Sequence, residues 1–216
     1  MGIGAAVSAN VHEIPIEEIR IEEKPFGHGG FGEVYKAKWR HRNVVVKVIR
    51  TYSEEEKQEV MLNADLAIRL SHPNVIDLFG IIHVKSWQIG IVMEEAEHGS
   101  LDQWIGKIYY EQLTKIALGI VDGLKYVHSR KVIHRDIKPK NILMFGPKYN
   151  KIPKIADFGA AKSIERTTKN SKVGEGYYMP PEVAQYCQYG FPADIFSLAV
   201  TLFEMFNEQL ISDAHV

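Results

Sequence analysis

The sequence is poor in the features that mark secreted and membrane proteins. Its 216 residues contain a single cysteine, Cys187, so no disulfide can form within the chain. This cysteine usage is typical of a reducing compartment, and we expect the protein to be cytoplasmic. The most apolar stretch, 196–206, is interrupted by Glu204 and is far shorter than the roughly 20 residues of a transmembrane helix, so no membrane span is expected.

An excess of charge of one sign is also missing. Lysine and arginine number 26 and aspartate and glutamate 27, which gives a net charge of −1. Without a general basic field, we expect no nucleic acid partner. Basic residues do gather between Lys131 and Lys172, but an acidic substrate or a phosphate group explains them equally well. None of the nine histidines has the spacing of a zinc motif such as H-E-x-x-H.

The N-terminal part has the pattern of an antiparallel sheet. Residues 1–13 are weakly patterned and are expected to form a tail. Apolar and polar residues then alternate or β-branched residues cluster, which predicts strands at 19–22, 35–40, 44–49, 75–84 and 89–93. Ser53 and Glu56 form a capping box, which predicts a helix that continues to Leu70.

The C-terminal part has a helical pattern instead. Apolar residues recur at helical spacing over 113–127 and again over 193–206. The pattern changes near 94–99, which indicates a linker between two lobes, 14–95 and 96–216. The expected fold class is α+β, with a small antiparallel β lobe that carries one helix and a larger, mostly α-helical lobe.

A glycine-rich turn lies between two of the expected strands. Gly27-His28-Gly29-Gly30-Phe31-Gly32 fits the pattern G-x-G-x-x-G, but a strand follows it, whereas a dinucleotide-binding motif opens into a helix. On a hairpin, glycines let backbone N–H groups approach phosphates without obstruction by side chains. A plain glycine-rich hairpin is the alternative at this point.

Lys47 interrupts a run of β-branched residues, Val44–Ile49, and shares a face with Val45 and Ile49. An ammonium group on an apolar face needs a partner, and phosphate oxygens together with a carboxylate would serve. The alternative is an edge strand whose lysine extends to water.

The strongest local signal is the loop His134-Arg135-Asp136-Ile137-Lys138-Pro139-Lys140-Asn141, which follows the long amphipathic segment. Asp157-Phe158-Gly159 comes after the next apolar run. Aspartate and asparagine oxygens suit Mg²⁺, a hard cation. A solvated charged loop is the alternative interpretation.

Together and in this order, these motifs resemble the signature set of the eukaryotic protein kinase catalytic domain, from about Ile14 to the end of the chain. The resemblance implies a bilobal kinase fold. The Ile14–Ile19 segment, Lys38-Trp39-Arg40 and His72-Pro73-Asn74 resemble the tyrosine-kinase-like group. Lys138, two residues after Asp136, is typical of serine/threonine specificity.

The resemblance implies ATP and Mg²⁺ as cofactors and a protein as substrate. The implied ATP-binding residues are Gly27, Gly29, Gly32, Val34, Val45, Lys47, Met93, Glu94, Ala96 and Leu143. Met93 would be the gatekeeper, and the backbone of Glu94 and Ala96 would bind adenine. Asn141 and Asp157 would hold Mg²⁺. Asp136 would accept the proton of the substrate hydroxyl, Lys138 would steady the γ-phosphate, and Glu59 would pair with Lys47.

The resemblance also implies regulation by an upstream kinase. Arg135 would bind a phosphorylated activation segment, in which Ser171 is the first candidate site, followed by Thr167, Thr168 and Ser163. Asp194 would brace the catalytic loop from the following helix.

Four features depart from the family pattern. Asn63 stands where the helix usually supplies the partner of Lys47, and Glu59 lies one helical turn earlier. Val45 replaces the usual alanine, and Glu175 stands where a threonine is usual. The chain also stops at Val216, before the last helices of the large lobe. A fragment, a truncated gene product and a chain completed by a partner would each explain the stop.

Two functions follow from the resemblance. The first is a serine/threonine protein kinase of a signal transduction pathway. The alternative is a pseudokinase or truncated kinase that acts as an ATP-binding scaffold or interaction module.

Overall fold

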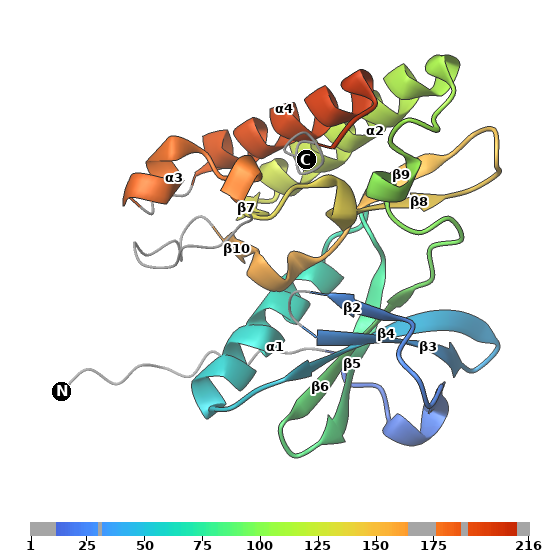
Figure 1. The fold of residues 1–216 in the computed structure, drawn as a ribbon. Coiled ribbons are helices and arrows are strands. Elements are labelled where there is room, and N and C mark those ends of the chain that lie inside the picture. Colours follow the sequence, from blue (N-terminus) through green and yellow to red (C-terminus); the bar gives the residue numbers. More distant parts are fainter. Residues whose placement is uncertain (1–11, 30–31, 164–175, 187–189, 211–216) are drawn as a thin grey trace. The chain divides into compact units, whose positions relative to one another are not determined.

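The computed structural model describes residues 12–29, 32–163, 176–186 and 190–210 (Figure 1). The described residues form two compact units. Unit 1 consists of the residues up to Arg69 together with Asp77–Glu95, and unit 2 consists of Leu70–Ile76 and the residues from Ala96 onward. The expected α+β class is confirmed, because unit 1 is an antiparallel sheet with one helix and unit 2 is mostly helical.

Unit 1 is built on a sheet in the order β1-β3-β4-β6-β5, with β2 paired to β3. Every pairing within it is antiparallel, as the alternating sequence pattern predicts. The strands are β1 (Ile19–Ile21), β2 (Gly27–Gly29), β3 (Gly32–Trp39), β4 (Arg42–Arg50), β5 (Leu78–Lys85) and β6 (Gln88–Glu94).

The two faces of β4 are both buried. Val44, Val46 and Val48 pack into a core whose other buried members are Ile14, Ile19, Ala37, Ile82 and Val92. Side chains alternate along a strand, so Val45, Lys47 and Ile49 point to the opposite face. Because β4 lies between β3 and β6, the alternative of an edge strand with a solvent-exposed lysine is wrong.

Helix α1 (Glu54–Ile68) begins where the capping box predicts. The Ser53 side chain accepts a hydrogen bond from the Glu56 backbone N–H at 3.2 Å, and the Glu56 carboxylate accepts one from the Tyr52 N–H at 2.8 Å. The helix packs its buried Ala64 against Ile81 of β5 and Ile89 of β6, with Val60 and Met61 beside them. This packing places α1 on the face of the sheet that carries Ile89.

The backbone of unit 1 pairs before the first strand. Ile14 donates its N–H to the Ile81 carbonyl, and Ile81 donates to the His12 carbonyl. Backbone pairing is therefore already present at His12, which belongs to the segment expected as a tail.

One glycine of the turn is required by a close backbone approach. A Cβ added at Gly32, where φ is 156°, would lie 2.2 Å from the Val48 carbonyl oxygen. A Cβ at Gly27 would meet nothing closer than the Val34 Cβ at 3.9 Å. Gly32 is thus needed for the packing of β3 on β4, whereas Gly27 is not needed for packing.

We expect Gly32→Ala to lower the free energy of unfolding by about 1–3 kcal/mol, because β3 or β4 must shift to relieve the clash. Gly27→Ala is the matched control and should cost less than about 1 kcal/mol. Urea unfolding of both variants measures the difference. Equal losses for the two variants would contradict the assigned contact.

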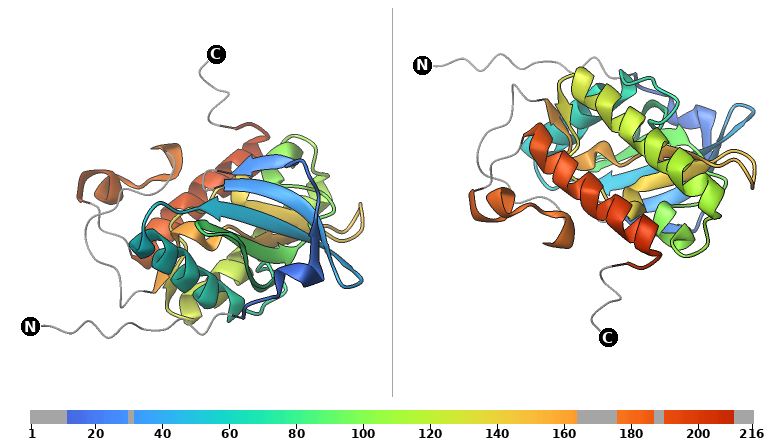
Figure 2. Two further views of the ribbon diagram at one scale, coloured as in Figure 1. Left: turned by 90° about the horizontal axis from the view of Figure 1, so that it is seen from below. Right: turned by 90° about the horizontal axis from the view of Figure 1, so that it is seen from above.

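Unit 2 is built around two long helices that lie side by side, α2 (Tyr110–Ser129) and α4 (Phe191–Asn207) (Figure 2). Both lie where the helical spacing predicts. Around them are α3 (Pro181–Tyr186), the pair β8 (Ile142–Phe145) and β9 (Ile152–Ile155), and the pair β7 (Val132–Ile133) and β10 (Lys162–Ser163).

The expected strand over 75–84 starts too early. Strand β5 begins at Leu78, and the preceding residues belong to unit 2. Ile76 donates its N–H to the Ile155 carbonyl of β9 at 2.9 Å, and the Asn74 carbonyl accepts from Ile155 at 2.9 Å. The apolar pattern of 75–76 therefore reflects burial beside β9.

Helix α4 exposes only part of its apolar surface. Ile195, Phe196, Phe203 and Phe206 are exposed, but Leu198 and Met205 are buried. Within the described ranges, no helix is both long enough and apolar enough to cross a bilayer.

Candidate functional site

The register of unit 1 brings several predicted ATP-binding side chains to one face. In an antiparallel pair, directly opposite residues share a face. Val34 lies opposite both Gly27 and Lys47, and Val45 lies opposite Met93. Val34, Val45, Lys47 and Met93 therefore line the same face of the sheet.

Lys47 is the charged residue in the middle of this face, and it is only 7% exposed. Ile49 lies two residues further along β4 and opposite Ile89, which contacts α1. Helix α1 thus covers the Lys47 side of the sheet. On α1, Glu59 is exposed and Asn63 is partly buried. The pairing of Glu59 with Lys47 stays a prediction.

A second lysine borders the same face. Lys36 lies opposite Val45, and its Nζ is 2.9 Å from Glu95 Oε1. The hydrogen bond to Glu95 raises the pKa of Lys36. Lys36 therefore stays a cation, bound to Glu95, across the neutral pH range.

The last residues of β6 and the segment after them carry the expected adenine contacts. The N–H of Glu94 donates to the Asp77 carbonyl at 3.1 Å, so a ligand would not take this N–H. In unit 2, the segment after Ala96 is fixed to β8. Met144 donates to the Gly99 carbonyl at 2.8 Å, and Leu143 forms a bridge with Ser100.

The loop that follows β7 is anchored by one buried carboxylate. Asp194, at the start of α4, is 1% exposed. Its two oxygens accept the backbone N–H groups of His134 and Arg135, each at 2.8 Å, and its Oδ2 also lies 2.8 Å from His128 Nε2. These donors compensate for burial of the charge. The predicted bracing of the loop by Asp194 is confirmed.

His134 fixes the loop from its other side. Its Nδ1 accepts the Asp136 N–H at 3.3 Å, which requires the proton of the neutral ring to be on Nε2. Nε2 then donates to the Ala156 carbonyl at 3.0 Å. The ring also packs edge-on against Phe158, with centroids 4.9 Å apart. His134 is fully buried, and the prediction of a loop-bracing core residue is confirmed.

Three predicted site residues meet at the Asp136 carboxylate. Lys138 Nζ lies 3.1 Å from Asp136 Oδ2, and Asn141 Nδ2 donates to the same oxygen at 2.7 Å. Asn141 Nδ2 also donates to the Asp136 backbone carbonyl at 2.7 Å. Within the described part of the chain, Asp136 Oδ1 accepts no hydrogen bond. This oxygen is thus available to a hydroxyl group.

Asp157 is tied to the same loop through its neighbour. Ala156 donates its N–H to the Asn141 carbonyl at 2.8 Å, and its carbonyl accepts from His134. Asp157 adopts a left-handed conformation, with φ 62° and ψ 69°, and its Oδ1 accepts from the Gly159 N–H at 3.3 Å. Its position relative to Asn141 is therefore set by backbone hydrogen bonds.

The donor set of Asn141 and Asp157 fits a magnesium ion. The amide nitrogen of Asn141 is committed to Asp136, so this side chain has its carbonyl oxygen to offer to a cation. Asp157 adds a partly buried carboxylate. Oxygen ligands of this kind are those that Mg²⁺ prefers.

Sequence reasoning missed two supporting contacts. His128, in the last turn of α2, binds Asp194 as described above. Glu204 on α4 is fully buried and accepts the Tyr178 hydroxyl with both oxygens, at 3.0 and 2.8 Å. A carboxylate within the apolar part of a helix is a signal for such a buried partner, although it does not identify Tyr178.

Several predicted residues lie outside the described ones. They are the candidate phosphorylation sites Thr167, Thr168 and Ser171, and Glu175 and Cys187. Arg135, the expected phosphate ligand, is described: it is buried and has a φ of 71°.

Comparison with known proteins relates most of this chain to one family. A sequence model of the family described as "Protein kinase domain" matches residues 21–215. The chain is 32% identical over 202 residues to a probable serine/threonine-protein kinase, gdt4, of Dictyostelium discoideum, which covers 90% of this chain and 12% of the relative.

Two vertebrate relatives are similar to the same degree. The chain is 33% identical to mitogen-activated protein kinase kinase kinase 10 of Xenopus laevis, over 92% of this chain and 21% of the relative. It is 34% identical to mitogen-activated protein kinase kinase kinase 7 of Homo sapiens, over 93% of this chain and 33% of the relative. The chain thus spans about a third or less of the length of these curated relatives.

Proposed function

Because this chain belongs to the protein kinase domain family, we propose that it transfers the γ-phosphate of ATP to serine and threonine hydroxyls of proteins. One observation supports this function above the others: Lys138 and Asn141 both contact Oδ2 of the Asp136 carboxylate, while its Oδ1 is available. A positioned carboxylate with an available oxygen can orient a hydroxyl and accept its proton.

In unit 2, which we assign to the C-terminal lobe, each residue has a distinct role. Asp136 Oδ1 takes the hydroxyl proton, while Asn141 and Lys138 hold Oδ2 and fix the direction of Oδ1. Lys138, already beside this carboxylate, neutralises charge on the transferred phosphoryl group. Asn141 and Asp157 hold Mg²⁺, which when bound offsets the charge of the phosphates.

In unit 1, which we assign to the N-terminal lobe, the same face binds the nucleotide. Lys47 binds the α- and β-phosphates, and the glycine hairpin at Gly27, Gly29 and Gly32 covers the phosphates. Val34, Val45 and Met93 pack against adenine from the face that they share. The buried position of Lys47 in a central strand supports this role, because such an ammonium group needs anionic partners.

The specificity and regulation of the chain are part of the proposal. Lys138 and the similarity to the probable serine/threonine-protein kinase of Dictyostelium discoideum support serine and threonine as acceptors. We propose that an upstream kinase phosphorylates Ser171, Thr167 or Thr168, that Arg135 binds the phosphate, and that the protein acts in the cytoplasm.

Thermal unfolding with and without Mg-ATP tests the nucleotide and metal roles. Mg-ATP is expected to raise the Tm of the full chain, by an amount that grows with ligand concentration. Asp157→Ala should abolish most of this shift, whereas Asp122→Asn, an exposed change on α2, should leave it intact. An equal shift for Asp157→Ala would overturn the metal role.

A transfer assay on the same parent chain and variants distinguishes a catalytic function from a scaffold function. A kinase transfers label from ATP to serine and threonine, whereas a pure ATP-binding scaffold shows the Tm shift without transfer. Transfer restricted to tyrosine would overturn the specificity that we assign to Lys138.

A further inference from the structure

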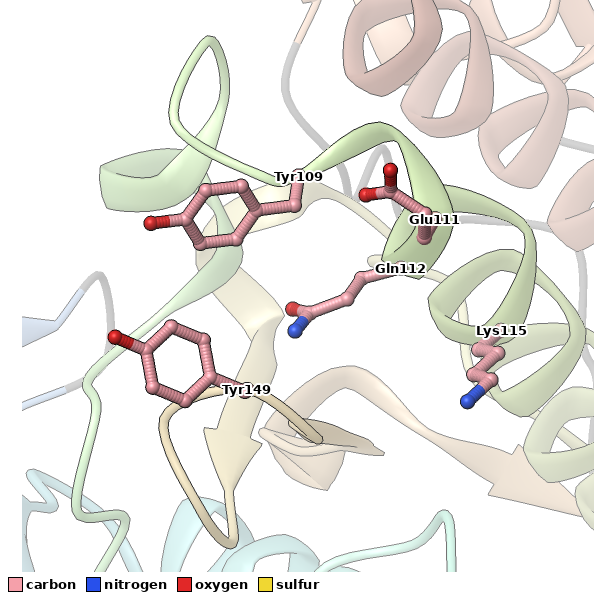
Figure 3. A pocket seen from close by; sticks show the side chains of 5 residues that line it. All are labelled: Tyr109, Glu111, Gln112, Lys115 and Tyr149. Carbon is pink, nitrogen blue, oxygen red and sulfur yellow. The ribbon is translucent and has the colours of Figure 1, made fainter.

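A second group of side chains lies on unit 2, where the start of α2 faces the turn between β8 and β9. Tyr109, Glu111, Gln112 and Lys115 come from the helix start, and Tyr149 comes from the turn. They line a pocket of about 390 Å³ (Figure 3). This volume falls within the range of roughly 300–1,000 Å³ typical of ligand sites. None of these residues has a role in the proposed catalysis.

Two tyrosines form the open side of this Tyr109–Tyr149 pocket. They are 55% and 68% exposed, and their ring centroids lie 6.1 Å apart at an angle of 41°. A flat ring stacked between them would need parallel rings about 7 Å apart, twice the usual contact distance of about 3.5 Å. The tilted rings instead present two adjoining apolar faces, against which the puckered ring of proline packs well.

Gln112 provides the polar group of the pocket. As a whole residue Gln112 is only 9% exposed, but its amide group is not among the buried polar groups without a partner, so solvent still reaches it. Figure 3 shows the amide directed toward the space between the two tyrosines. A ligand that enters the pocket can therefore take the place of water at this amide. A polyproline segment has carbonyl groups that are not bonded internally, and these can accept from the amide nitrogen.

The charges around the pocket select the flanking residues of that ligand. Two cations lie at or near the pocket: Lys115 lines it, and Lys148 Nζ lies 5.5 Å from the Tyr149 ring centroid. Among the residues that line the pocket, Glu111 provides one carboxylate. A cation within about 6 Å already interacts with the Tyr149 ring, so a second cation would be repelled. Acidic residues beside the proline are therefore favoured.

The turn that carries Tyr149 is held in place before any ligand binds. Lys151 Nζ donates to the Lys148 carbonyl and lies 3.9 Å from the Trp104 ring centroid, and Asn150 donates to the Pro147 carbonyl. A turn fixed in this way loses little conformational freedom on binding.

We propose that the Tyr109–Tyr149 pocket binds an extended, proline-containing segment of a partner protein that carries acidic residues beside its prolines. The tyrosine faces hold the proline rings, Gln112 donates to a backbone carbonyl, and Lys115 and Lys148 attract the carboxylates. This recognition is independent of ATP and of phosphoryl transfer.

Fluorescence anisotropy of the full chain with labelled peptides, in the absence of ATP, tests the proposal. The probe is a peptide of repeated Pro-Pro-Glu triplets, and the comparison peptides carry Ala-Ala-Glu or Pro-Pro-Lys triplets. We expect each comparison peptide to bind at least about tenfold more weakly than the probe. Because the comparison changes only the ligand, its result does not depend on the folding of any variant.

Variants of the chain locate the binding site. Tyr149→Ala is expected to weaken binding of the probe by about tenfold or more, and Gln112→Leu by about threefold to tenfold. Tyr110→Ala is the matched control, because Tyr110 is 84% exposed but does not line the pocket, and it should change binding less than about twofold.

Equal binding of the probe and the Ala-Ala-Glu peptide would overturn the proposal, as would equal losses in Tyr149→Ala and Tyr110→Ala. Tighter binding of the Pro-Pro-Lys peptide would overturn the assigned charge preference. Binding of a thymidine oligonucleotide that Tyr149→Ala abolishes, without binding of the probe, would assign the pocket to a nucleobase instead.

Discussion

Asp136→Asn is expected to lower kcat for phosphate transfer by about 10²–10⁴-fold, the usual range for loss of a positioned general base. Asparagine keeps the shape of the side chain and can still accept the hydrogen bond from Asn141, but it cannot take up the hydroxyl proton. The KM for ATP should change less than about threefold, because Asp136 acts on the acceptor hydroxyl and is not assigned to the nucleotide.

Steady-state kinetics of the variant and the parent chain measure both quantities. Asp122→Asn is the matched control, since it makes the same chemical change at an exposed position of α2. A kcat for Asp136→Asn within a few fold of the parent value would remove Asp136 from catalysis. A large rise in the KM for ATP with little change in kcat would move its role to nucleotide binding.

Asp194→Ala should strongly destabilise unit 2. The change leaves the buried N–H groups of His134 and Arg135 without their acceptor and removes the charge next to His128. We expect the free energy of unfolding to fall by about 3–5 kcal/mol, as when one partner of a buried charged pair is deleted. Domains are stable by only about 5–15 kcal/mol, so this loss is a large fraction of the total.

Urea unfolding followed by tryptophan fluorescence measures this loss, because Trp104 belongs to unit 2. Asp194→Asn should be less destabilising than Asp194→Ala, since one acceptor oxygen remains, and Asp122→Asn should stay within about 0.5 kcal/mol of the parent chain. If Asp194→Ala also stayed within that margin, the loop would have to be held by other contacts.

Local patterns predicted much of the fold because each of them needed only neighbouring residues. The capping box located the start of α1, and apolar spacing located α2 and α4. The same reasoning failed at Val75 and Ile76, whose apolar character looked like the start of a strand. Their burial depends on β9, some 80 residues further along the chain, which no local pattern reveals.

The environment of Lys47 could be determined only once the pairing of the whole sheet was known. From the sequence alone, a buried central strand and an edge strand were both possible for Val44–Ile49. The pairing of β4 with β6, more than 40 residues away, is what excludes the edge strand. This pairing is long-range. The register that places Val34, Val45 and Met93 on the same face as Lys47 could therefore not be predicted from the sequence of β4 alone.

The catalytic loop was predictable as a motif, but its support was only partly so. Asp194 was identified through resemblance, whereas the contribution of His128 and the Tyr178–Glu204 contact were not. The Tyr109–Tyr149 pocket was also invisible in the sequence, because its tyrosines come from a helix start and from a turn about 40 residues later. Such sites depend on packing between segments and not on spacing within one.

The most direct test of the central claim is a transfer assay with ATP labelled on its terminal phosphate, Mg²⁺ and a general protein substrate, with the full chain and its Asp136→Asn variant side by side. The account predicts label on serine and threonine of the substrate with the parent chain, loss of this label when Mg²⁺ is chelated, and almost none with the variant. Equal labelling by the two proteins, or none by the parent chain that nonetheless binds Mg-ATP, would contradict it.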